Sequence, residues 1–211
     1  MEIKPEDYSW QSLYKILIGS VLPRPIGWIS SVDAEGHNNL APFSFFNVIC
    51  ANPPHVMFCP SVRGTDMGRK DTLHNVRATG EFVVNIVTEA TVEAMNLTAT
   101  ELPSDIDEFE YAGLTPIASK LVKPQRVAES PIHFECKVTQ ILDISEQAGG
   151  GSMVIGEVIY MHIDDAVLYD GEKIDLTVLR PVGRLAGTSY TRVTDLFDLV
   201  RRPTQVKPKD T

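Results

Sequence analysis

Apolar and polar positions alternate most clearly from Pro131 onward, and this alternation predicts a β-strand. The two faces of the strand would carry Phe134, Cys136 and Val138 on one side and Glu135, Lys137 and Thr139 on the other. The phase changes near Gln140, as it does where a β-bulge inserts a residue. Three glycines at 149–151 predict a turn, and residues 153–164 then predict the returning strand of a long hairpin.

Shorter apolar runs predict the other elements. Apolar residues at helical spacing over 9–17 indicate a helix, with Ser9 as its N-cap and Gly19 as its stop. A strand over 26–32, a polar turn and a partner strand over 39–48 form a hairpin, in which Pro42 indicates an edge or a bulge. The remaining expected elements are strands at 56–59 and 81–87, helices at 72–78 and 91–99, an acidic loop at 101–110 and a helical turn or two at 194–200.

This succession of elements favours an antiparallel closed or half-closed barrel. Seven or so strands, mostly in hairpins with short helices between them, give a mainly β fold with peripheral α-helices. A strict βαβ alternation is absent, which argues against a doubly wound fold. We expect one domain over 8–203, followed by a polar tail at 204–211.

Charge and cysteine content narrow the range of functions. The net charge is −9, which disfavours nucleic acid or an anionic membrane as a general partner. The three cysteines are scattered, without the clustering of a metal site, so we predict none. The first residues lack a signal-peptide core, and no apolar run approaches the roughly 20 residues of a membrane span, so we expect a cytoplasmic protein.

The candidate chemistry lies between Asn39 and Thr72. The run Phe43-Ser44-Phe45-Phe46-Asn47 offers aromatic faces, a hydroxyl and an amide, which suit a flat polar ring. A cationic group then follows, Arg63, Arg69 and Lys70, ahead of a helix that Asp71 or Thr72 would cap. Cations beside a helix N-terminus form a site for a phosphate. The working hypothesis is a bound flavin nucleotide.

Each signal also has a purely structural interpretation. A solvated loop before a capped helix explains the cations equally well, and strand aromatics usually belong to a core. Strand alternation places Ser44 and Phe46 opposite Phe45 and Asn47, so both pairs can reach one ring only if the edge is irregular. His162 lies alone in a strand, where a structural role is commoner than proton handling beside a redox ring.

At these residues the chain resembles the flavin reductase-like family of FMN-binding split-barrel proteins, which includes flavoredoxin-type members. The similarity extends over about 13–203, and it rests on the order and spacing of several short motifs. These are 20–26 (SVLPRPI), 39–47 (NLAPFSFFN), 52–54 (NPP), 70–73 (KDTL) with Asn75, 80–85 (GEFVVN), 155–158 (IGEV), and 184–187 (RLAG) with Tyr190.

The resemblance implies a six-stranded antiparallel split barrel that works as a homodimer with FMN near the subunit interface. It implies flavin-binding roles for Arg24, Ser44, Phe45, Phe46 and Asn47 at the ring and ribityl chain, for Ser61, Arg63, Lys70 and Thr72 at the phosphate, and for Tyr190 from the partner subunit. It also implies a catalytic role for His162 near a nicotinamide.

The resemblance further implies an NAD(P)H-dependent flavin oxidoreductase that passes hydride from a nicotinamide to flavin N5, with NADH or NADPH as a transient co-substrate. The main alternative is a flavoredoxin-like electron carrier with a protein redox partner. A monooxygenase partner and a barrel that has lost its flavin to become a binding module are further alternatives.

Overall fold

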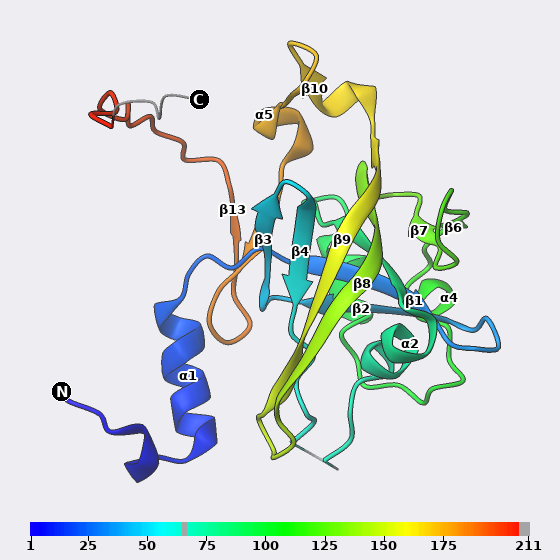
Figure 1. The fold of residues 1–211 in the computed structure, drawn as a ribbon, viewed down its shortest axis with the longest axis vertical. Helices are drawn as coiled ribbons and strands as arrows, with labels where there is room; N and C mark the ends of the chain where they lie inside the picture. The colour runs from blue at the N-terminus through cyan, green and yellow to red at the C-terminus, as the bar shows by residue number, and fades with distance from the viewer. Residues whose placement is uncertain (65–66, 207–211) are drawn as a thin grey trace.

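A seven-stranded antiparallel sheet organises the structure, a computed structural model that describes residues 1–64 and 67–206 (Figure 1). The strand order is β2-β1-β5-β8-β9-β4-β3, so the chain-adjacent strands β2 and β3 form the two edges. The predicted antiparallel, mainly β fold is confirmed, with seven strands in the main sheet where six were expected. The strands are β1 (Gly27–Val32), β2 (Asn38–Phe43), β3 (Phe46–Ala51), β4 (Pro54–Phe58), β5 (Glu81–Ile86), β8 (Ile132–Ser145) and β9 (Gly151–Ile163).

Short helices and two-stranded pairs surround this sheet. The helices are η1 (Pro5–Asp7), α1 (Trp10–Ser20), α2 (Asp71–Thr79), α3 (Val92–Leu97), α4 (Glu108–Tyr111), η2 (Asp165–Val167) and α5 (Leu176–Leu179). The pairs are β6 (Pro116–Ile117) with β7 (Arg126–Val127), β10 (Leu168–Tyr169) with β11 (Lys173–Ile174), and β12 (Val182–Arg184) with β13 (Tyr190–Arg192). Helix α1 and residues 193–206 after β13 lie on one side of the sheet, apart from the body (Figure 1). In the described part of the chain, no helix is long and apolar enough to cross a membrane.

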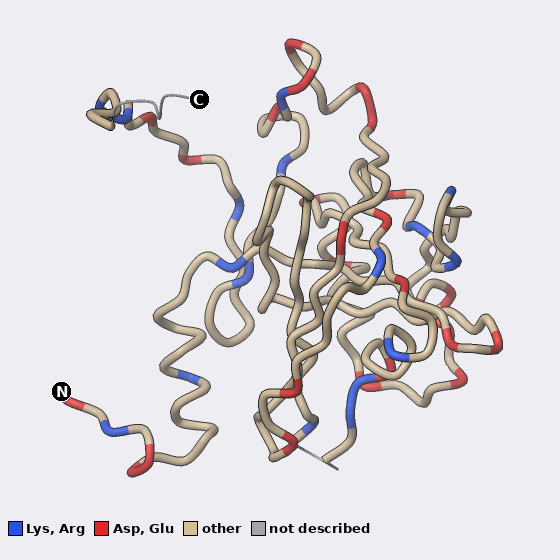
Figure 2. Tube along the Cα trace, in the orientation of Figure 1, with Lys and Arg blue, Asp and Glu red and all other residues tan. Residues whose placement is uncertain are grey.

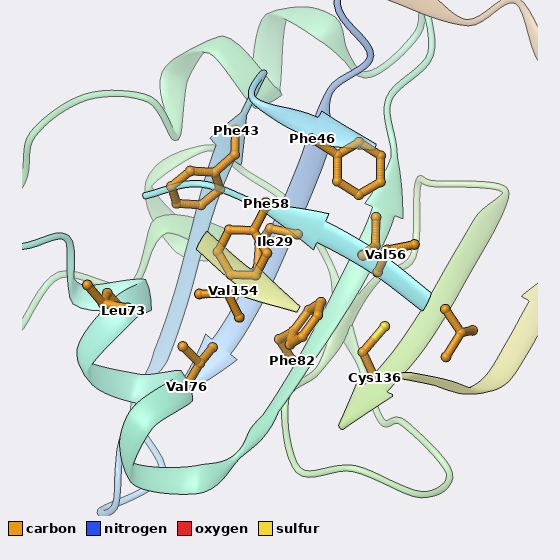
Figure 3. Close-up of a cluster of buried hydrophobic side chains, with 12 residues drawn as sticks. Ile29, Phe43, Phe46, Val56, Phe58, Leu73, Val76, Phe82, Cys136 and Val154 are labelled. Atoms are coloured by element: carbon orange, nitrogen blue, oxygen red, sulfur yellow. The ribbon is translucent and has the colours of Figure 1, made fainter. Parts of the chain in front are cut away.

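The main core lies inside the curved sheet and is built around aromatic rings. The Phe58 ring packs against Phe43 and Phe82, with centroid separations of 5.0 and 5.2 Å. Leu73 and Val76 of α2 close one side of this cluster (Figure 3). Helix α2 ends at Gly80, whose φ of 71° is the left-handed conformation that glycine adopts without strain. The buried face of α2 therefore fixes where its N-terminus lies.

The long β8–β9 hairpin confirms the strand pair that the alternation predicted. Its register shifts at three places, and one of them, between Val138 and Gln140, matches the predicted bulge. At Gly156, a Cβ atom would lie 2.5 Å from the Phe82 ring, so the core requires a residue without a side chain there. The bulges let a long strand pair bend around this core.

Three sequence-based expectations were wrong in detail. The run over 39–48 is interrupted at Ser44 and Phe45, which separate β2 from β3. The N-cap position of α2 is Lys70 rather than Asp71 or Thr72, and it makes no side-chain capping bond. Residues 194–200 form no helical turn, because their apolar side chains lie exposed and pack against no core within this chain.

Candidate functional site

A small cavity of about 80 Å³ lies between strand β2 and the start of α2. Its walls come from five parts of the chain: β2, the loop before α2, the first turn of α2, the segment after α3 and the start of α4. The residues that matter for its chemistry are Pro42, Arg63, Lys70, Thr72, Glu101 and Glu108. A cavity of this size suits an anion-sized group, since pockets for whole small molecules are about 300–1,000 Å³.

The start of α2 supplies the positive end of this cavity. The first N–H groups of a helix have no intrahelical partner, and the helix dipole adds partial positive charge there. Among the described residues, Lys70 at the N-cap position makes no side-chain capping bond, and Leu73 N–H donates to the Lys70 carbonyl oxygen, so the N–H groups of Asp71 and Thr72 are the ones open to another partner. Lys70 and Arg63 add two cations to the same wall. Figure 2 shows the basic residues on the segment that leads into α2.

An acidic side chain competes for Lys70. The Lys70 Nζ atom lies 3.3 Å from Oε1 of Glu101, and both side chains are partly exposed. An ion pair at a surface is worth about 0–1 kcal/mol, so a doubly charged phosphate can replace Glu101 as the partner of Lys70. Arg69 lies elsewhere, because its guanidinium pairs with Glu146 and Asp143 at the β8–β9 hairpin.

A buried polar network supports the floor of the cavity. The hydroxyl of Thr72 donates to Oδ1 of Asn39 at 2.7 Å, and Asn39 Nδ2 donates to Oε1 of Glu108 at 3.0 Å. Oε2 of Glu108 accepts the backbone N–H of Leu40, and burial raises the pKa of this carboxyl while its hydrogen bonds oppose the shift. Because the Thr72 hydroxyl is directed at Asn39, Thr72 would offer an anion its backbone N–H.

Ser44 and Phe45 lie at the break between β2 and β3, beside Arg24. Ser44 Oγ accepts from Arg24 Nε at 3.3 Å, and the Arg24 guanidinium lies 6.0 Å from the Phe45 ring centroid. Arg24 also donates to the carbonyl oxygens of Ile18, Val21 and Leu185. Arg24 thus ties α1 and the β12 region to the Ser44–Phe45 corner.

The other residues predicted to bind flavin occupy four separate positions. Phe46 is buried in the core cluster, while the exposed Asn47 accepts the N–H of Val48. Ser61 pairs with Gly151 through an isolated bridge. The Tyr190 hydroxyl donates to Asn96 at 3.0 Å, and its ring lies 4.4 Å from the Arg184 guanidinium carbon. Within one chain, the structure brings Arg63, Lys70 and Thr72 together and, separately, Arg24, Ser44 and Phe45.

His162 lies at neither of these groups. Its Nε2 contacts Oε1 of Glu135 at 2.5 Å, and its ring lines a second cavity that shares no lining residue with the first. Sequence reasoning missed Glu135, because a charged residue in an alternating strand is expected to face water. It also missed Glu108 and Glu101, which no local pattern connects to Lys70 or Asn39.

Comparison with known proteins identifies the family to which this protein belongs. The sequence model of a family described as "Flavin reductase like domain" matches residues 18–175. The chain belongs to this family. Flavin reductase-like proteins are flavin-binding oxidoreductases, so the flavin hypothesis is supported at the level of the family.

Three relatives show how far the similarity to other flavin reductase-like proteins extends. An uncharacterised protein of Halalkalibacterium halodurans is 41% identical over 203 residues, which is 95% of this chain and 96% of the relative. The crystal structure of nitrilotriacetate monooxygenase component B from Bacillus cereus has a TM-score of 0.89 at 36% identity and covers 94% of this chain and 98% of its own. The structure of 2-nitrobenzoate 2-nitroreductase NbaA from Pseudomonas fluorescens has a TM-score of 0.85 at 32% identity and covers 99% of both chains.

Proposed function

We propose that this flavin reductase-like protein binds FMN and oxidises NADH or NADPH. The observation that supports this most directly is the cavity at the uncapped N-terminus of α2, which Lys70 and Arg63 line. A bound flavin would supply the redox chemistry, by accepting a hydride from the nicotinamide at N5 and passing the electrons to an acceptor.

The residues present fit a flavin mononucleotide. The phosphate end needs cations and N–H donors, and Lys70, Arg63 and the first turn of α2 provide both. Asp71, Glu101 and Glu108 are acidic members of the same wall. Glu101 pairs with Lys70 at the surface. Glu108 is engaged by Asn39 and by the Leu40 N–H, so it serves the floor rather than opposing the anion. Ser44 and Phe45, at the irregular edge, offer a hydroxyl and an exposed aromatic face for the ring.

We further propose that the active form is a homodimer. Exposed apolar side chains lie on α1, on β3 and on the C-terminal segment, among them Leu17 (56% exposed), Val48 (60%) and Phe197 (81%). Apolar side chains gathered on neighbouring elements indicate an interface. A partner subunit on this side would also cover Phe45, and its residues would line the open end of the flavin site.

The dimer is tested by light scattering on Val48→Asp. The unmodified protein should have twice the 23.3 kDa mass of one chain, and Val48→Asp should shift it toward the monomer, because a buried unpaired carboxylate opposes association. Ile144→Asp, at an exposed apolar position on the β8–β9 hairpin (72% exposed against 60% for Val48), is the control. A monomeric unmodified protein would exclude this interface.

The activity is tested with purified protein and added FMN under anaerobic conditions. We expect a flavin absorbance band that bleaches on titration with NADH or NADPH, because the bound flavin is reduced. Bound flavin that neither nucleotide reduces would exclude the NAD(P)H oxidoreductase and favour an electron carrier reduced by a redox protein. A protein that takes up no FMN would exclude both.

The physiological acceptor separates two candidate functions that the relatives' names favour. The 36% identity to a monooxygenase component B favours delivery of electrons to a partner monooxygenase. The 32% identity to a 2-nitrobenzoate 2-nitroreductase favours a small nitroaromatic acceptor. NAD(P)H consumption with free FMN, compared with 2-nitrobenzoate, distinguishes the two.

A further inference from the structure

A carboxylate of the β8–β9 hairpin holds both ends of α2. Oδ1 of Asp143, in β8, lies 3.5 Å from Nη1 of Arg69 and accepts a hydrogen bond from Nη2 of Arg77 at 2.5 Å. Arg69 directly precedes Lys70, the N-cap residue of α2, and Arg77 lies in the last turn of this helix. Asp143 does not line the cavity at the start of α2, so its contacts with the helix are made from outside that cavity.

Asp143 is itself held in place by the neighbouring strand. Asp143 and Ser152 face each other in the β8–β9 register, and the Ser152 hydroxyl donates to Oδ1 of Asp143 at 2.6 Å. Ser152 is only 5% exposed, so water competes little for its hydroxyl. The hydrogen bonds from Ser152 and Arg77 lower the pKa of Asp143, which therefore carries its negative charge at pH 7.

The Arg69 side chain is directed at the hairpin and does not line the cavity at α2. Its Nη1 is buried beside Asp143, while its Nη2 pairs with Glu146, whose side chain is 78% exposed. One planar peptide unit joins Arg69 to Lys70, which does line the cavity. A guanidinium held at the hairpin therefore limits how far the backbone at Lys70 can move.

The chain ahead of α2 contacts the same end of the hairpin (Figure 1). The Val62 N–H donates to the carbonyl oxygen of Gly150 at 2.9 Å. At Gly151, a Cβ atom would lie 2.7 Å from the carbonyl oxygen of Pro60, so this close approach requires a glycine. The hairpin thus holds the chain before the proposed phosphate site through its backbone, and the start of α2 through Asp143.

We propose that Asp143 positions the start of α2 for the flavin phosphate, and that it thereby favours FMN over riboflavin without touching either molecule. This inference rests on the proposed function, because it takes the phosphate to bind at Lys70 and the first turn of α2. The donors there are backbone N–H groups and an ammonium group, whose hydrogen bonds weaken steeply when the distance or angle departs from its optimum. Contacts that hold these donors in place before the ligand arrives reduce the cost of binding.

A purely electrostatic effect of Asp143 would have the opposite sign. A carboxylate near the phosphate repels it, so removing the carboxylate would then strengthen FMN binding. Glu146 separates the two effects, because it carries the same charge at the same hairpin. Among the described residues, Glu146 pairs with Arg69 alone, and its high exposure makes that pair weak.

The test compares the Kd values of FMN and riboflavin for Asp143→Asn, at roughly 0.15 M salt to screen distant charges. We expect the Kd of FMN to rise about three- to tenfold, since two surface ion pairs are lost, and that of riboflavin to change by less than about 1.5-fold, since riboflavin has no phosphate to place. Asp143→Glu, which keeps the charge, should recover part of the loss. Glu146→Gln, the control for charge alone, should change the Kd of FMN by less than about twofold.

Three results with Asp143→Asn would overturn the inference: an unchanged Kd of FMN, tighter binding of FMN, or equal losses for FMN and riboflavin, which indicate general damage to the fold. Lys70→Ala separates this failure from failure of the proposed function. If Lys70→Ala weakens FMN binding and Asp143→Asn does not, the phosphate lies at α2 and only the positioning role of Asp143 is wrong. If neither variant weakens FMN binding, the proposed phosphate site is wrong as well.

Discussion

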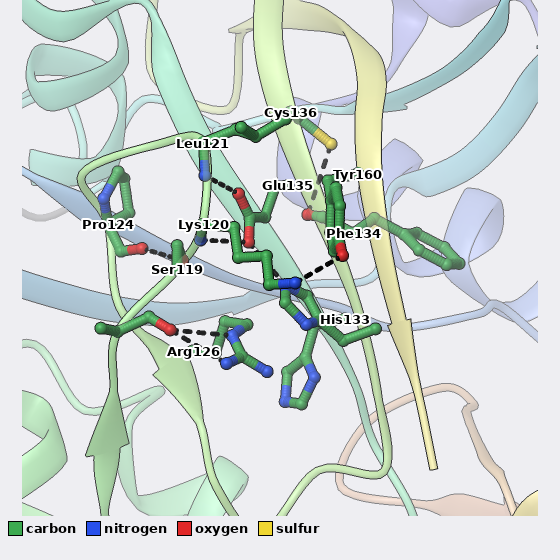
Figure 4. Close-up of polar contacts among 12 residues, drawn as sticks. Ser119, Lys120, Leu121, Pro124, Arg126, His133, Phe134, Glu135, Cys136 and Tyr160 are labelled. Atoms are coloured by element: carbon green, nitrogen blue, oxygen red, sulfur yellow. Dashed lines mark hydrogen bonds and ion pairs between the residues drawn. The ribbon is translucent and has the colours of Figure 1, made fainter. Parts of the chain in front are cut away.

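Replacing Glu135 with alanine is expected to destabilise the fold by about 3–5 kcal/mol, the range for removing one partner of a buried charged pair. The carboxylate is fully buried and accepts three hydrogen bonds, from the Lys120 N–H, the Leu121 N–H and His162 Nε2 (Figure 4). Alanine leaves these donors without their acceptor and opens a cavity beneath the 118–124 loop. Urea unfolding followed by circular dichroism measures the loss.

Two variants give this prediction its controls. Glu93→Ala removes an exposed glutamate from α3 and should change stability by less than about 0.5 kcal/mol. Glu135→Gln keeps the shape of the side chain but exchanges one acceptor for a donor. Its loss of stability should therefore lie between those of Glu93→Ala and Glu135→Ala. A Glu135→Ala protein as stable as Glu93→Ala would show that the three hydrogen bonds contribute nothing net.

Acid should remove the same stability. Burial raises the pKa of Glu135, but the hydrogen bonds from Lys120, His162 and Leu121 outweigh it and leave that pKa below its usual value. A carboxylate with a lowered pKa stabilises the fold above its unfolded pKa, about 4.5 for glutamate, and loses that contribution as the pH falls through the folded pKa. The unmodified protein should therefore lose more stability below about pH 4.5 than Glu135→Ala does.

Glu135 also shows where sequence reasoning reached its limit. Alternation correctly predicted the β8 strand and its pairing with β9, because the apolar face of that strand is set by local sequence. It placed Glu135 on the polar face, which is commonly solvent-exposed. The register shift between Glu135 and Cys136, and the 118–124 loop that covers the carboxylate, depend on contacts distant in sequence.

The residues of the candidate site, too, could be predicted from the sequence only where they lie close together in the chain. Arg63, Lys70 and Thr72 lie within ten residues of one another, and a local pattern of cations before a helix was enough to group them. Glu101 and Glu108 reach the same cavity from the segments after α3, more than 25 residues further along the chain. The assembled cavity therefore shows a competitor for Lys70 and a buried support for Thr72 that no short motif contains.

Replacing Lys70 with alanine is expected to weaken FMN binding by about 1.5–3 kcal/mol, or roughly 10- to 150-fold in Kd, because a charge-assisted hydrogen bond to the phosphate is lost. The loss should lie toward the lower end of that range. Lys70 must leave Glu101 to reach the phosphate, and this exposed pair offsets the gain by up to about 1 kcal/mol. Quenching of flavin fluorescence on binding measures the Kd.

Glu101→Gln provides a second test of this site, because it is expected to strengthen FMN binding whereas Lys70→Ala weakens it. Without the competing carboxylate, Lys70 is free to bind phosphate, and FMN should bind up to about fivefold more tightly. In the double variant the benefit of Glu101→Gln should largely disappear, since it acts through Lys70. Lys15→Ala removes the same charge from exposed α1 and should leave the Kd unchanged. If Lys70→Ala also leaves the Kd unchanged, the flavin phosphate does not lie at the start of α2, whatever reduction by NAD(P)H shows.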